Sequence, residues 1–377
     1  MKHLVIFRTS CAIIDINSYN CQEIGLAKAL SKDLKISIIL AGKKYKHRIL
    51  FHNDKEINIY FLPIFAINQS LGILKGWERL LKKISPDFVQ IHEFGILMSA
   101  LVVKWAKKYN IPSFLIQGNY QTTLKPIFRQ LEIIYNHTIG RYVLNNVNGI
   151  GCKTLMASRY IHKYCSRKTI LTYVGIDTSI FQDSFLIDWK KMYNIEGKHI
   201  LLYVGKLEER RNPLFLVDII SQLSSDFVLL LVGEGPLEKE IRHKIKELNL
   251  QNRCILLGKL KQEELPSLYK ISDIFLLASN YEIYGMVILE TMYFELPIIS
   301  SLTAGSETLI ETGKDGIIIK EFDVKKWVNT INNICKNKKK LKLMGELACY
   351  KIKNSMTWDN TSKTYLKLYL DNHNVSL

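Results

Sequence analysis

Residues 278–301 read ASNYEIYGMVILETMYFELPIISS, and this stretch decides how the rest of the chain is interpreted. The run SDIFLLAS at residues 272–279 is apolar and ends in small residues, which predicts a buried parallel strand. The apolar residues after Gly285 recur at helical spacing up to Pro297: Met286, Ile288, Leu289, Met292 and Tyr293. A strand, a polar loop and a helix that begins at glycine bring free backbone N–H groups and the positive end of a helix dipole to one point. We therefore expect an anion-binding site here.

Two carboxylates accompany this anion site. Glu282 falls in the loop and Glu290 in the second helical turn, where side chains lean back toward the helix N-terminus, so both can face one ligand. Carboxylates do not bind phosphate, and their natural partners are hydroxyl groups. A ligand with a central diphosphate and polyol rings on both sides satisfies this pattern, as a nucleotide sugar does. The alternative is two surface glutamates that flank an ordinary buried helix.

The run Glu282-Ile-Tyr284-Gly285-Met-Val-Ile-Leu-Glu290 resembles the E-x7-E signature of the retaining GT4 glycosyltransferases, often written E-x-F/Y-G-x4-E. The resemblance implies that Glu282 lies beside the donor sugar and that Glu290 holds the ribose of the nucleotide. It also implies a donor-binding role for the residues between them: Tyr284, Gly285, Met286 and Val287.

The resemblance implies an α/β protein of the GT-B fold, in which two Rossmann-like domains face each other across a cleft. The length of 377 residues suits two domains, and 47% hydrophobic residues suffice for two cores. We expect an acceptor-binding domain over residues 1–182 and a nucleotide-sugar-binding domain over residues 183–356. A C-terminal helix, residues 357–377, is expected to cross back to the first domain.

The second half supplies cations after its first strand. Gly205 and Lys206 follow the apolar run HILLYV, and Arg211 comes five residues after Lys206. Two cations at the carboxyl end of a strand can converge on one diphosphate. The family pattern here is G-R-L-x3-K-G/N, so the two basic residue types are exchanged in this chain. The family also has turns beside the nucleotide that correspond to Gly233 and Leu260.

The first half alternates β-rich and amphipathic runs, which predicts a parallel sheet flanked by helices. His92 in FVQIHEFG matches a family position, and it either lines the acceptor pocket or makes a structural hydrogen bond. Gln117 stands where the family commonly has a histidine, and with Asn119 it can orient an acceptor hydroxyl. The family's Gly-Gly pair after the first strand is missing, and Asn20 offers a polar contact there instead.

Charge is uneven along the chain. The net charge is +17, and residues 1–183 hold 25 Lys and Arg against 11 Asp and Glu, a net charge of +14. Such a basic half is expected to meet an anionic partner. The stretch LGILKGWERLLKKI, residues 71–84, predicts a basic amphipathic helix that lies either on an anionic membrane or on the sheet.

Cysteine usage and hydropathy bound the location. The seven cysteines show no C-x-x-C pair, which predicts reduced thiols and no metal site. The apolar runs are strand-sized, and no signal peptide or spanning helix is expected. We expect a cytoplasmic protein that is peripheral on the inner face of the cell membrane.

The resemblance therefore implies a retaining glycosyltransferase, and we expect it to need neither metal nor cofactor. The expected donor is a UDP- or GDP-sugar. The expected acceptor is a saccharide, most simply lipid-linked, in bacterial surface polysaccharide biosynthesis. A nucleotide-sugar 2-epimerase of the same fold is the alternative enzyme. Only the net charge suggests a nucleic-acid-binding protein. The sequence has neither the aromatic strands of RNA-binding domains nor cysteines and histidines at the spacing of zinc ligands, so no nucleic-acid partner is expected.

Overall fold

A computed structural model describes residues 1–18, 21–122, 126–181 and 187–370. The chain divides into two compact units. Unit 1 comprises Met1–Asp177 and Trp358–Leu377, and unit 2 comprises Thr178–Thr357. The sequence-based domain boundaries, 182/183 and 356/357, fall within five residues of these divisions. Each unit is described by itself.

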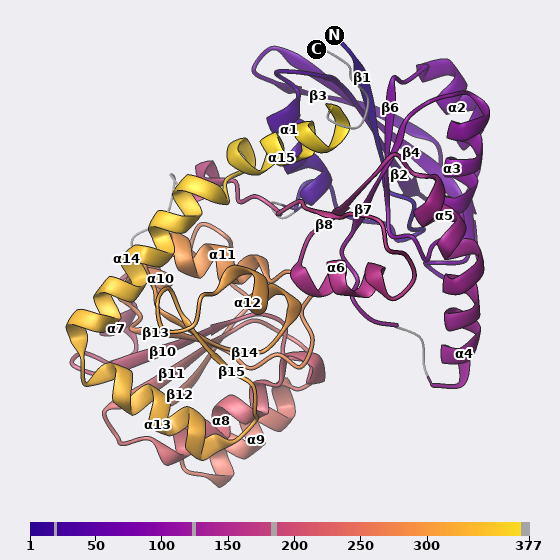
Figure 1. Ribbon diagram of the computed structural model, residues 1–377. Helices are drawn as coiled ribbons and strands as arrows, with labels where there is room; N and C mark the ends of the chain where they lie inside the picture. Colours follow the sequence, from indigo (N-terminus) through magenta and orange to yellow (C-terminus); the bar gives the residue numbers. More distant parts are fainter. Residues whose placement is uncertain (19–20, 123–125, 182–186, 371–377) are drawn as a thin grey trace. The chain divides into compact units, whose positions relative to one another are not determined.

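Unit 1 is built on a mainly parallel sheet (Figure 1). Its described strands, in spatial order, are β3 (Lys46–His52), β4 (Lys55–Ala66), β2 (Lys35–Gly42), β1 (His3–Phe7), β6 (Phe88–His92), β7 (Ser113–Gln117), β8 (Gly149–Cys152) and β9 (Ile170–Leu171), with β5 (Gly72–Leu74) paired to β4. All five residues of β1 are buried, as are those of β6 and β7. These central strands are buried on both faces because helices cover both faces.

Helices lie on the two faces of this sheet (Figure 1). Its described helices are α1 (Gln22–Leu30), α2 (Trp77–Ile84), α3 (Leu97–Lys108), α4 (Pro126–Tyr135), the π-helical turn Asn136–Gly140, α5 (Arg141–Asn146), α6 (Leu155–His162) and α15 (Trp358–Leu370). Side chains of α2, α3, α5 and α6 form one hydrophobic core with the strands. No helix in the described ranges combines the length and apolarity that a membrane crossing requires.

The hairpin of β3 and β4 was missed by the sequence analysis, which expected parallel pairing only. Both β3·β4 and β4·β5 are antiparallel. Every residue of β3 is exposed or half-buried, so the strand carries no burial pattern. The signal that could have found it is the turn Asn53-Asp54, where both residues have positive φ, +46° and +58°. Such two-residue turns join hairpin strands.

The helix expected over residues 71–84 is wrong in its first half. Gly72–Leu74 forms β5, and α2 begins only at Trp77, after Gly76 with φ +79°. The apolar side of α2 packs on the sheet, since Trp77, Leu80 and Leu81 are buried in the core. Trp77 is therefore an interior residue, 6% exposed, and the sheet covers the apolar side of this helix.

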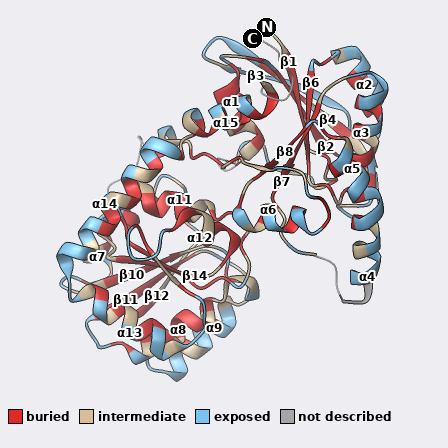
Figure 2. Ribbon diagram, viewed as in Figure 1, coloured by how far each residue is buried: buried red, intermediate tan, exposed pale blue. Residues whose placement is uncertain are grey.

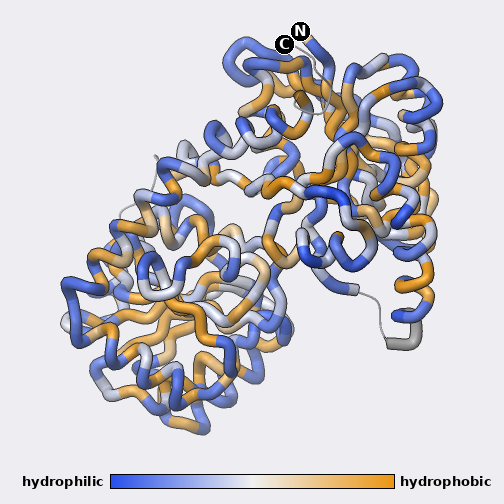
Figure 3. Tube along the Cα trace, in the orientation of Figure 1, coloured by the Kyte–Doolittle hydropathy of each residue, from blue (hydrophilic) through white to orange (hydrophobic). Residues whose placement is uncertain are grey.

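Unit 2 contains a fully parallel sheet, which confirms the expected Rossmann-like arrangement. Its described strands, in spatial order, are β12 (Cys254–Gly258), β11 (Phe227–Val232), β10 (His199–Val204), β13 (Ile274–Leu277), β14 (Ile298–Ser301) and β15 (Ile317–Ile319). The inner strands β11, β10, β13 and β14 are largely buried in Figure 2 and hydrophobic in Figure 3, whereas most residues of the edge strands β12 and β15 are half-buried. Near-continuous apolar runs are typical of parallel strands covered on both sides.

The helices of unit 2 also form two layers (Figure 1). They are the 3₁₀ turn Thr178–Phe181, α7 (Trp189–Met192), the 3₁₀ turn Glu209–Arg211, α8 (Pro213–Gln222), α9 (Glu238–Glu247), α10 (Leu265–Ile271), α11 (Met286–Tyr293), α12 (Ala304–Leu309), α13 (Val324–Cys335) and α14 (Lys338–Ser355). Helices α8, α9 and α13 share one core with the strands, around Trp327. The helix expected after Gly285 is α11, and the prediction is confirmed.

The last described helix, α15, belongs to unit 1 although it follows unit 2 in the chain. It packs against α1, where a Cβ at Gly25 would lie 2.1 Å from Nε1 of Trp358. Tyr369 is fully buried, and its hydroxyl donates to the side-chain oxygen of Gln90 on β6. The helix therefore completes one face of the unit 1 sheet.

Candidate active site

The candidate donor site lies at the carboxyl edge of the unit 2 sheet. The loops that leave β10, β11 and β12 touch through their backbones: Gly205 N donates to Val232 O at 3.0 Å, and Gly233 N donates to Gly258 O at 2.8 Å. Gly233 has φ +138°, and a Cβ there would lie 1.9 Å from Gly205 O. Only glycine allows this approach. The edge thus exposes backbone to a ligand at the place where parallel sheets bind ligands.

Glu282 and Arg211 meet at this edge. Arg211 lies in the turn after β10, Glu282 lies in the loop after β13, and these strands are neighbours in the sheet. The Arg211 guanidinium donates to Glu282 Oε2. Arg210 Nη1 lies 3.8 Å from the same oxygen and donates to Tyr281 O at 3.0 Å. The structure therefore joins Glu282, predicted beside the donor sugar, and Arg211, predicted at the diphosphate, in an ion pair.

Arg211 and its surroundings contain unused hydrogen-bonding groups. Its Nε is buried, as is Ser279 Oγ at the end of β13, and neither has a hydrogen-bond partner among the described residues. Burial and the adjacent Arg210 lower the pKa of Arg211 from its usual value. A buried donor without a partner is costly, so an incoming anion is a favourable occupant here.

Lys206 was expected to converge with Arg211 on one diphosphate, but the two side chains differ in their surroundings. The Lys206 side chain is exposed and forms no ion pair with any described residue, whereas Arg211 is held by Glu282. The backbone at Lys206 is fixed, because its carbonyl accepts from the Tyr203 hydroxyl at 2.7 Å. Lys206 is thus an uncompensated cation on the same loop as the Arg211 ion pair.

The N-terminus of α11 lies where the sequence predicts an anion site, and the binding of an anion there stays a prediction. Gly285 is its N-cap with φ +80°, and no side chain caps the helix. Met286 and Val287, both half-buried, begin the helix. Tyr284 is buried, and a Cβ at Gly305 would lie 1.9 Å from its carbonyl oxygen. The start of α12 therefore presses against the loop that carries Glu282.

Glu290 lies deeper than its predicted contact with a ribose suggests. It is 1% exposed, and its Oε2 accepts from the Tyr269 hydroxyl at 2.7 Å. Tyr269 belongs to α10, the helix that leads into β13. Leu260 lies just past β12, in the turn whose Gly258 accepts from Gly233. The ribose contact of Glu290 and the base contact of Leu260 stay predictions.

Among the acceptor-side candidates, His92 is a structural hydrogen bonder. It is 8% exposed, and its Nε2 lies 2.8 Å from Nε2 of Gln90, an amide that can only donate, so this ring nitrogen accepts. Burial lowers the pKa of His92 to about 3, which keeps the ring neutral near pH 7. Asn20 lies outside the described residues.

Gln117 and Asn119 are engaged by a residue that the sequence analysis left without a role. Glu93, at φ +62°, accepts at Oε2 from Gln117 Nε2 at 2.5 Å and at Oε1 from Gly118 N at 2.9 Å. Asn119 N also donates to this carboxylate, at 3.2 Å to Oε2. Burial raises the pKa of Glu93, although the nearby Lys153 and these N–H donors lower it in part. Glu93 therefore fixes the loop after β7.

Charged residues missed by the sequence analysis stand beside Glu93. Arg8 follows β1 and lies 2.5 Å from Glu23 Oε1, and Lys153 follows β8 and donates to Gln22 Oε1 at 2.7 Å. Burial opposes ionisation of Glu23, but the neighbouring charges, Arg8 first, bring its pKa down to about 2. The sequence position of Arg8 and Lys153 could have revealed them, because each directly follows a strand and ligands bind at the carboxyl ends of strands. No group of three or more metal-ligating side chains occurs among the described residues.

Known proteins resemble this chain in sequence. Residues 187–348 match the family of glycosyl transferases group 1. The UDP-Gal:alpha-D-GlcNAc-diphosphoundecaprenol alpha-1,3-galactosyltransferase of Escherichia coli is 24% identical over 84% of this chain and 85% of that protein. A Campylobacter jejuni alpha-1,4-N-acetyl-D-galactosaminyltransferase, named for a GalNAc-containing PP-undecaprenol saccharide, is 23% identical over 83% of this chain and 85% of that protein.

Solved structures show the same fold. Anabaena Alr3699/HepE in complex with UDP has a TM-score of 0.77 at 14% identity and covers 98% of this chain and 100% of its own. Sucrose-phosphate synthase from Thermosynechococcus elongatus has a TM-score of 0.78 at 16% identity, with 100% coverage of both chains. The expected GT-B fold is thereby confirmed. The match to the glycosyl transferases group 1 family covers most of unit 2, and the protein is a glycosyltransferase.

Proposed function

We propose that the protein transfers a sugar from a UDP-sugar to a hydroxyl of a lipid-linked saccharide, with retention at the anomeric carbon. The part of the proposal that concerns the donor rests on one observation: closely packed backbone and the Arg211–Glu282 ion pair lie at the carboxyl edge of the unit 2 sheet. The choice of UDP over GDP is supported by the Anabaena structure, which contains UDP, and by the Escherichia coli relative, which is named for UDP-Gal.

In this proposal, cations and backbone amides receive the charge of the leaving diphosphate. Lys206 offers an uncompensated ammonium group, Arg211 offers an unused Nε, and the start of α11 offers free N–H groups. Such donors stabilise developing charge without a metal ion. Glu282 holds hydroxyls of the donor sugar. Glu290 accepts from Tyr269 and reaches the ribose only if this bond is exchanged or shared.

The acceptor half is supported by the two bacterial relatives, whose names specify diphosphoundecaprenol and PP-undecaprenol saccharides. Residues 1–183 carry a net charge of +14, from 25 Lys and Arg against 11 Asp and Glu, which suits a phosphorylated lipid at an anionic membrane surface. We place the reaction at the inner face of the cell membrane, in surface polysaccharide assembly. These relatives are transferases, which favours transfer over epimerisation.

A transfer assay tests the proposal. The protein is incubated with single UDP- and GDP-sugars and a short-chain prenyl-diphosphate-linked sugar, with EDTA present. The expected result is a mass increase of one sugar for one UDP-sugar, with an anomeric proton coupling that shows retention. Donor consumption that yields an isomer without an acceptor would replace the proposal by epimerisation. Activity that EDTA abolishes and a divalent ion restores would contradict metal independence.

A further inference from the structure

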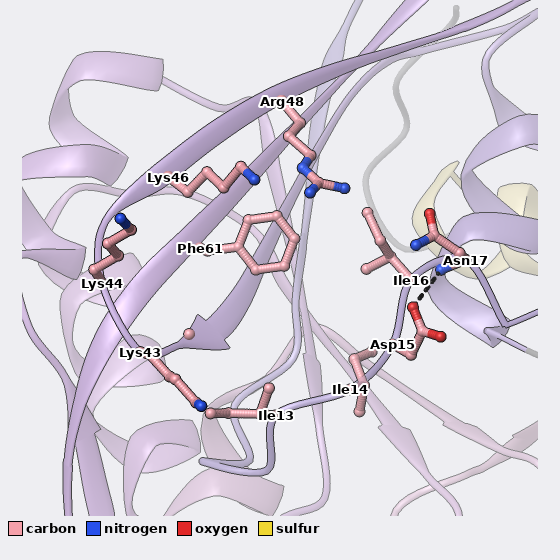
Figure 4. A pocket seen from close by; sticks show the side chains of 11 residues that line it. Ile13, Ile14, Asp15, Ile16, Asn17, Lys43, Lys44, Lys46, Arg48 and Phe61 are labelled. Carbon is pink, nitrogen blue, oxygen red and sulfur yellow. Dashed lines mark hydrogen bonds between the residues drawn. The ribbon is translucent and has the colours of Figure 1, made fainter.

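A cavity lies at the carboxyl edge of the unit 1 sheet, and none of the site residues described above lines it (Figure 4). Its volume is about 410 Å³. One wall is the loop after β1, and the other is formed by the end of β2, the start of β3 and Phe61 of β4. Its lining residues are Ile13, Ile14, Asp15, Ile16, Asn17, Gly42, Lys43, Lys44, Lys46, Arg48 and Phe61.

Four cations surround this cavity. Lys43 and Lys44 follow the end of β2, and Lys46 and Arg48 occupy alternate positions of β3, which places them on one face of that strand. All four are exposed, and none forms an ion pair with a described residue. Like charges gathered in one place repel each other, and an anion between them relieves this repulsion.

The single carboxylate of the lining does not neutralise these cations. Asp15 Oδ1 accepts from the backbone N of Asn17 at 3.0 Å, and its carbonyl accepts from Ser18 N at 3.3 Å. Figure 4 shows the bond between Asp15 and Asn17 within the loop, with Lys46 and Arg48 on the opposite wall. The carboxylate thus shapes its own turn and leaves the cations available.

The other part of the lining is apolar. Ile13, Ile14 and Ile16 come from the loop where the family has its Gly-Gly pair, and Ile13 is 52% exposed. Phe61 is the register partner of Lys46 in the β3·β4 ladder, and the Arg48 guanidinium lies over its ring at 6.0 Å from the centroid. The cavity therefore offers cations beside a branched aliphatic wall.

We propose that this cavity binds the diphosphate and the first isoprene units of the lipid-linked acceptor. The diphosphate lies among Lys43, Lys44, Lys46 and Arg48, and the branched chain lies on the isoleucines and Phe61. A free phosphate needs no isoleucine wall, and a nucleic-acid strand needs a series of stacking aromatics, whereas this cavity has one aromatic ring. The inference rests on the proposed function, because it assumes a lipid-linked acceptor.

The position of the cavity suits an acceptor. It opens at the ends of β1 and β2, on the edge of the sheet that also carries Glu93 and Gln117 after β6 and β7. A diphosphate held there leaves the attached saccharide free to extend along the same edge. The isoleucine loop thus provides a lipid contact in place of the family's glycine pair.

The test measures binding of farnesyl diphosphate by calorimetry at low salt, with UDP at saturation so that the unit 2 site is occupied. Inorganic diphosphate, farnesol and anionic phospholipid vesicles are measured in parallel. The variants are Lys46→Gln with Arg48→Gln, and Ile13→Asn. The control exchanges two exposed lysines of α14, Lys338→Gln with Lys339→Gln, which removes the same charge from unit 2.

We expect farnesyl diphosphate to bind the native protein and the control equally. Lys46→Gln with Arg48→Gln should weaken it by about tenfold or more, since a charge-assisted contact contributes on that scale. Ile13→Asn should weaken farnesyl diphosphate and leave inorganic diphosphate unchanged. Equal binding of farnesyl diphosphate by all variants would overturn the inference, as would inorganic diphosphate binding as tightly as the prenyl compound.

Two further outcomes separate the inference from the proposed function. Binding to anionic vesicles without binding of farnesyl diphosphate would overturn the inference in favour of a general membrane surface. UDP binding is followed by thermal stabilisation of each variant, which also confirms folding. Absence of UDP binding in the native protein, with farnesyl diphosphate bound as expected, would contradict the proposed donor and support the cavity.

Discussion

The guanidinium of Arg211 donates to the carboxylate of Glu282, although 71 positions separate the two residues in the chain. The pair joins the turn after β10 to the loop after β13. Both side chains were expected to face the donor, one toward diphosphate and one toward sugar. In the structure the Glu282 carboxylate is bound to the Arg211 guanidinium, so a donor diphosphate that binds Arg211, as proposed, would compete with this ion pair.

Replacing Glu282 by Gln tests this competition. The substitution removes the negative charge that holds Arg211, so UDP should bind about tenfold more tightly, on the scale of one charge-assisted hydrogen bond. Transfer should nevertheless fall by about 10²-fold or more if Glu282 orients the donor sugar. Calorimetry with UDP and initial rates measure the two effects. Glu234→Gln, at an exposed carboxylate of the same edge, is the control, and weaker UDP binding in Glu282→Gln would contradict the competition.

Lys206→Gln should reduce activity without affecting stability. The side chain is exposed and has no ion-pair partner among the described residues, so its loss costs the fold little. The diphosphate loses one cation, and UDP affinity should fall by about tenfold. Urea unfolding measures the stability, UDP titration measures the affinity for UDP, and initial rates of transfer measure the activity. Lys198→Gln, at a half-buried lysine near the opposite end of β10 whose Nζ donates to Ser225 O at 3.2 Å, should leave UDP affinity unchanged.

The sequence predicted unit 2 better than unit 1 for a physical reason. Buried parallel strands are continuously apolar, and their carboxyl-end loops must carry the ligand groups, so Gly205, Arg211 and Glu282 could be found from their positions alone. In unit 1 the exposed strand β3 has no burial pattern. The pairing of Arg211 with Glu282 could not be predicted, because it depends on which loop side chains meet in three dimensions.

Gly233→Ala should destabilise the protein and weaken donor binding. Gly233 has φ +138°, and the added Cβ would lie 1.9 Å from Gly205 O, so the loops after β10 and β11 must separate. We expect a loss of about 3 kcal/mol or more in the free energy of unfolding. Gly197→Ala is the matched control: its φ is +73°, but no atom lies within 4 Å of the added Cβ. It should cost about 1 kcal/mol, and equal losses in urea unfolding would contradict the contact.

Stability should fall as the pH drops below about 6.5 because two histidines are buried in the neutral form. Burial lowers the pKa of His92 to about 3 and that of His3 to about 4, whereas both titrate near 6.5 in the unfolded chain. The unfolded state therefore binds more protons below pH 6.5, and each histidine removes about 1.4 kcal/mol per pH unit down to its folded pKa. Glu23, whose pKa is about 2, adds a loss only below about pH 4.5.

Urea unfolding between pH 7 and 4.5 isolates the histidine contribution. Above about pH 5.5 Glu23 is ionised in both states and adds nothing to the slope, so a change of slope in a histidine variant reports that histidine. Replacing His3 by Gln should remove about half of the slope. An unchanged slope in His3→Gln would show that this ring is not buried in its neutral form.

Tyr369→Phe should destabilise unit 1 through residues on a different element. The Tyr369 hydroxyl on α15 donates to the Gln90 side-chain oxygen, and the Gln90 amide donates to His92 Nε2 at 2.8 Å. Without the hydroxyl, the fully buried Gln90 oxygen loses this donor, which costs about 1–3 kcal/mol. Tyr350→Phe, at a tyrosine that is 70% exposed, should leave the free energy of unfolding unchanged.

The location of the loss distinguishes this bond from a general packing effect. Hydrogen exchange of β6 and α15 should accelerate together in Tyr369→Phe, because the bond joins the terminal helix to the central strands of unit 1. Exchange in β10 and β11 should stay unchanged, since they belong to unit 2. Acceleration confined to α15 would show that the helix end frays without any effect on Gln90, and the bond would then contribute nothing to the sheet.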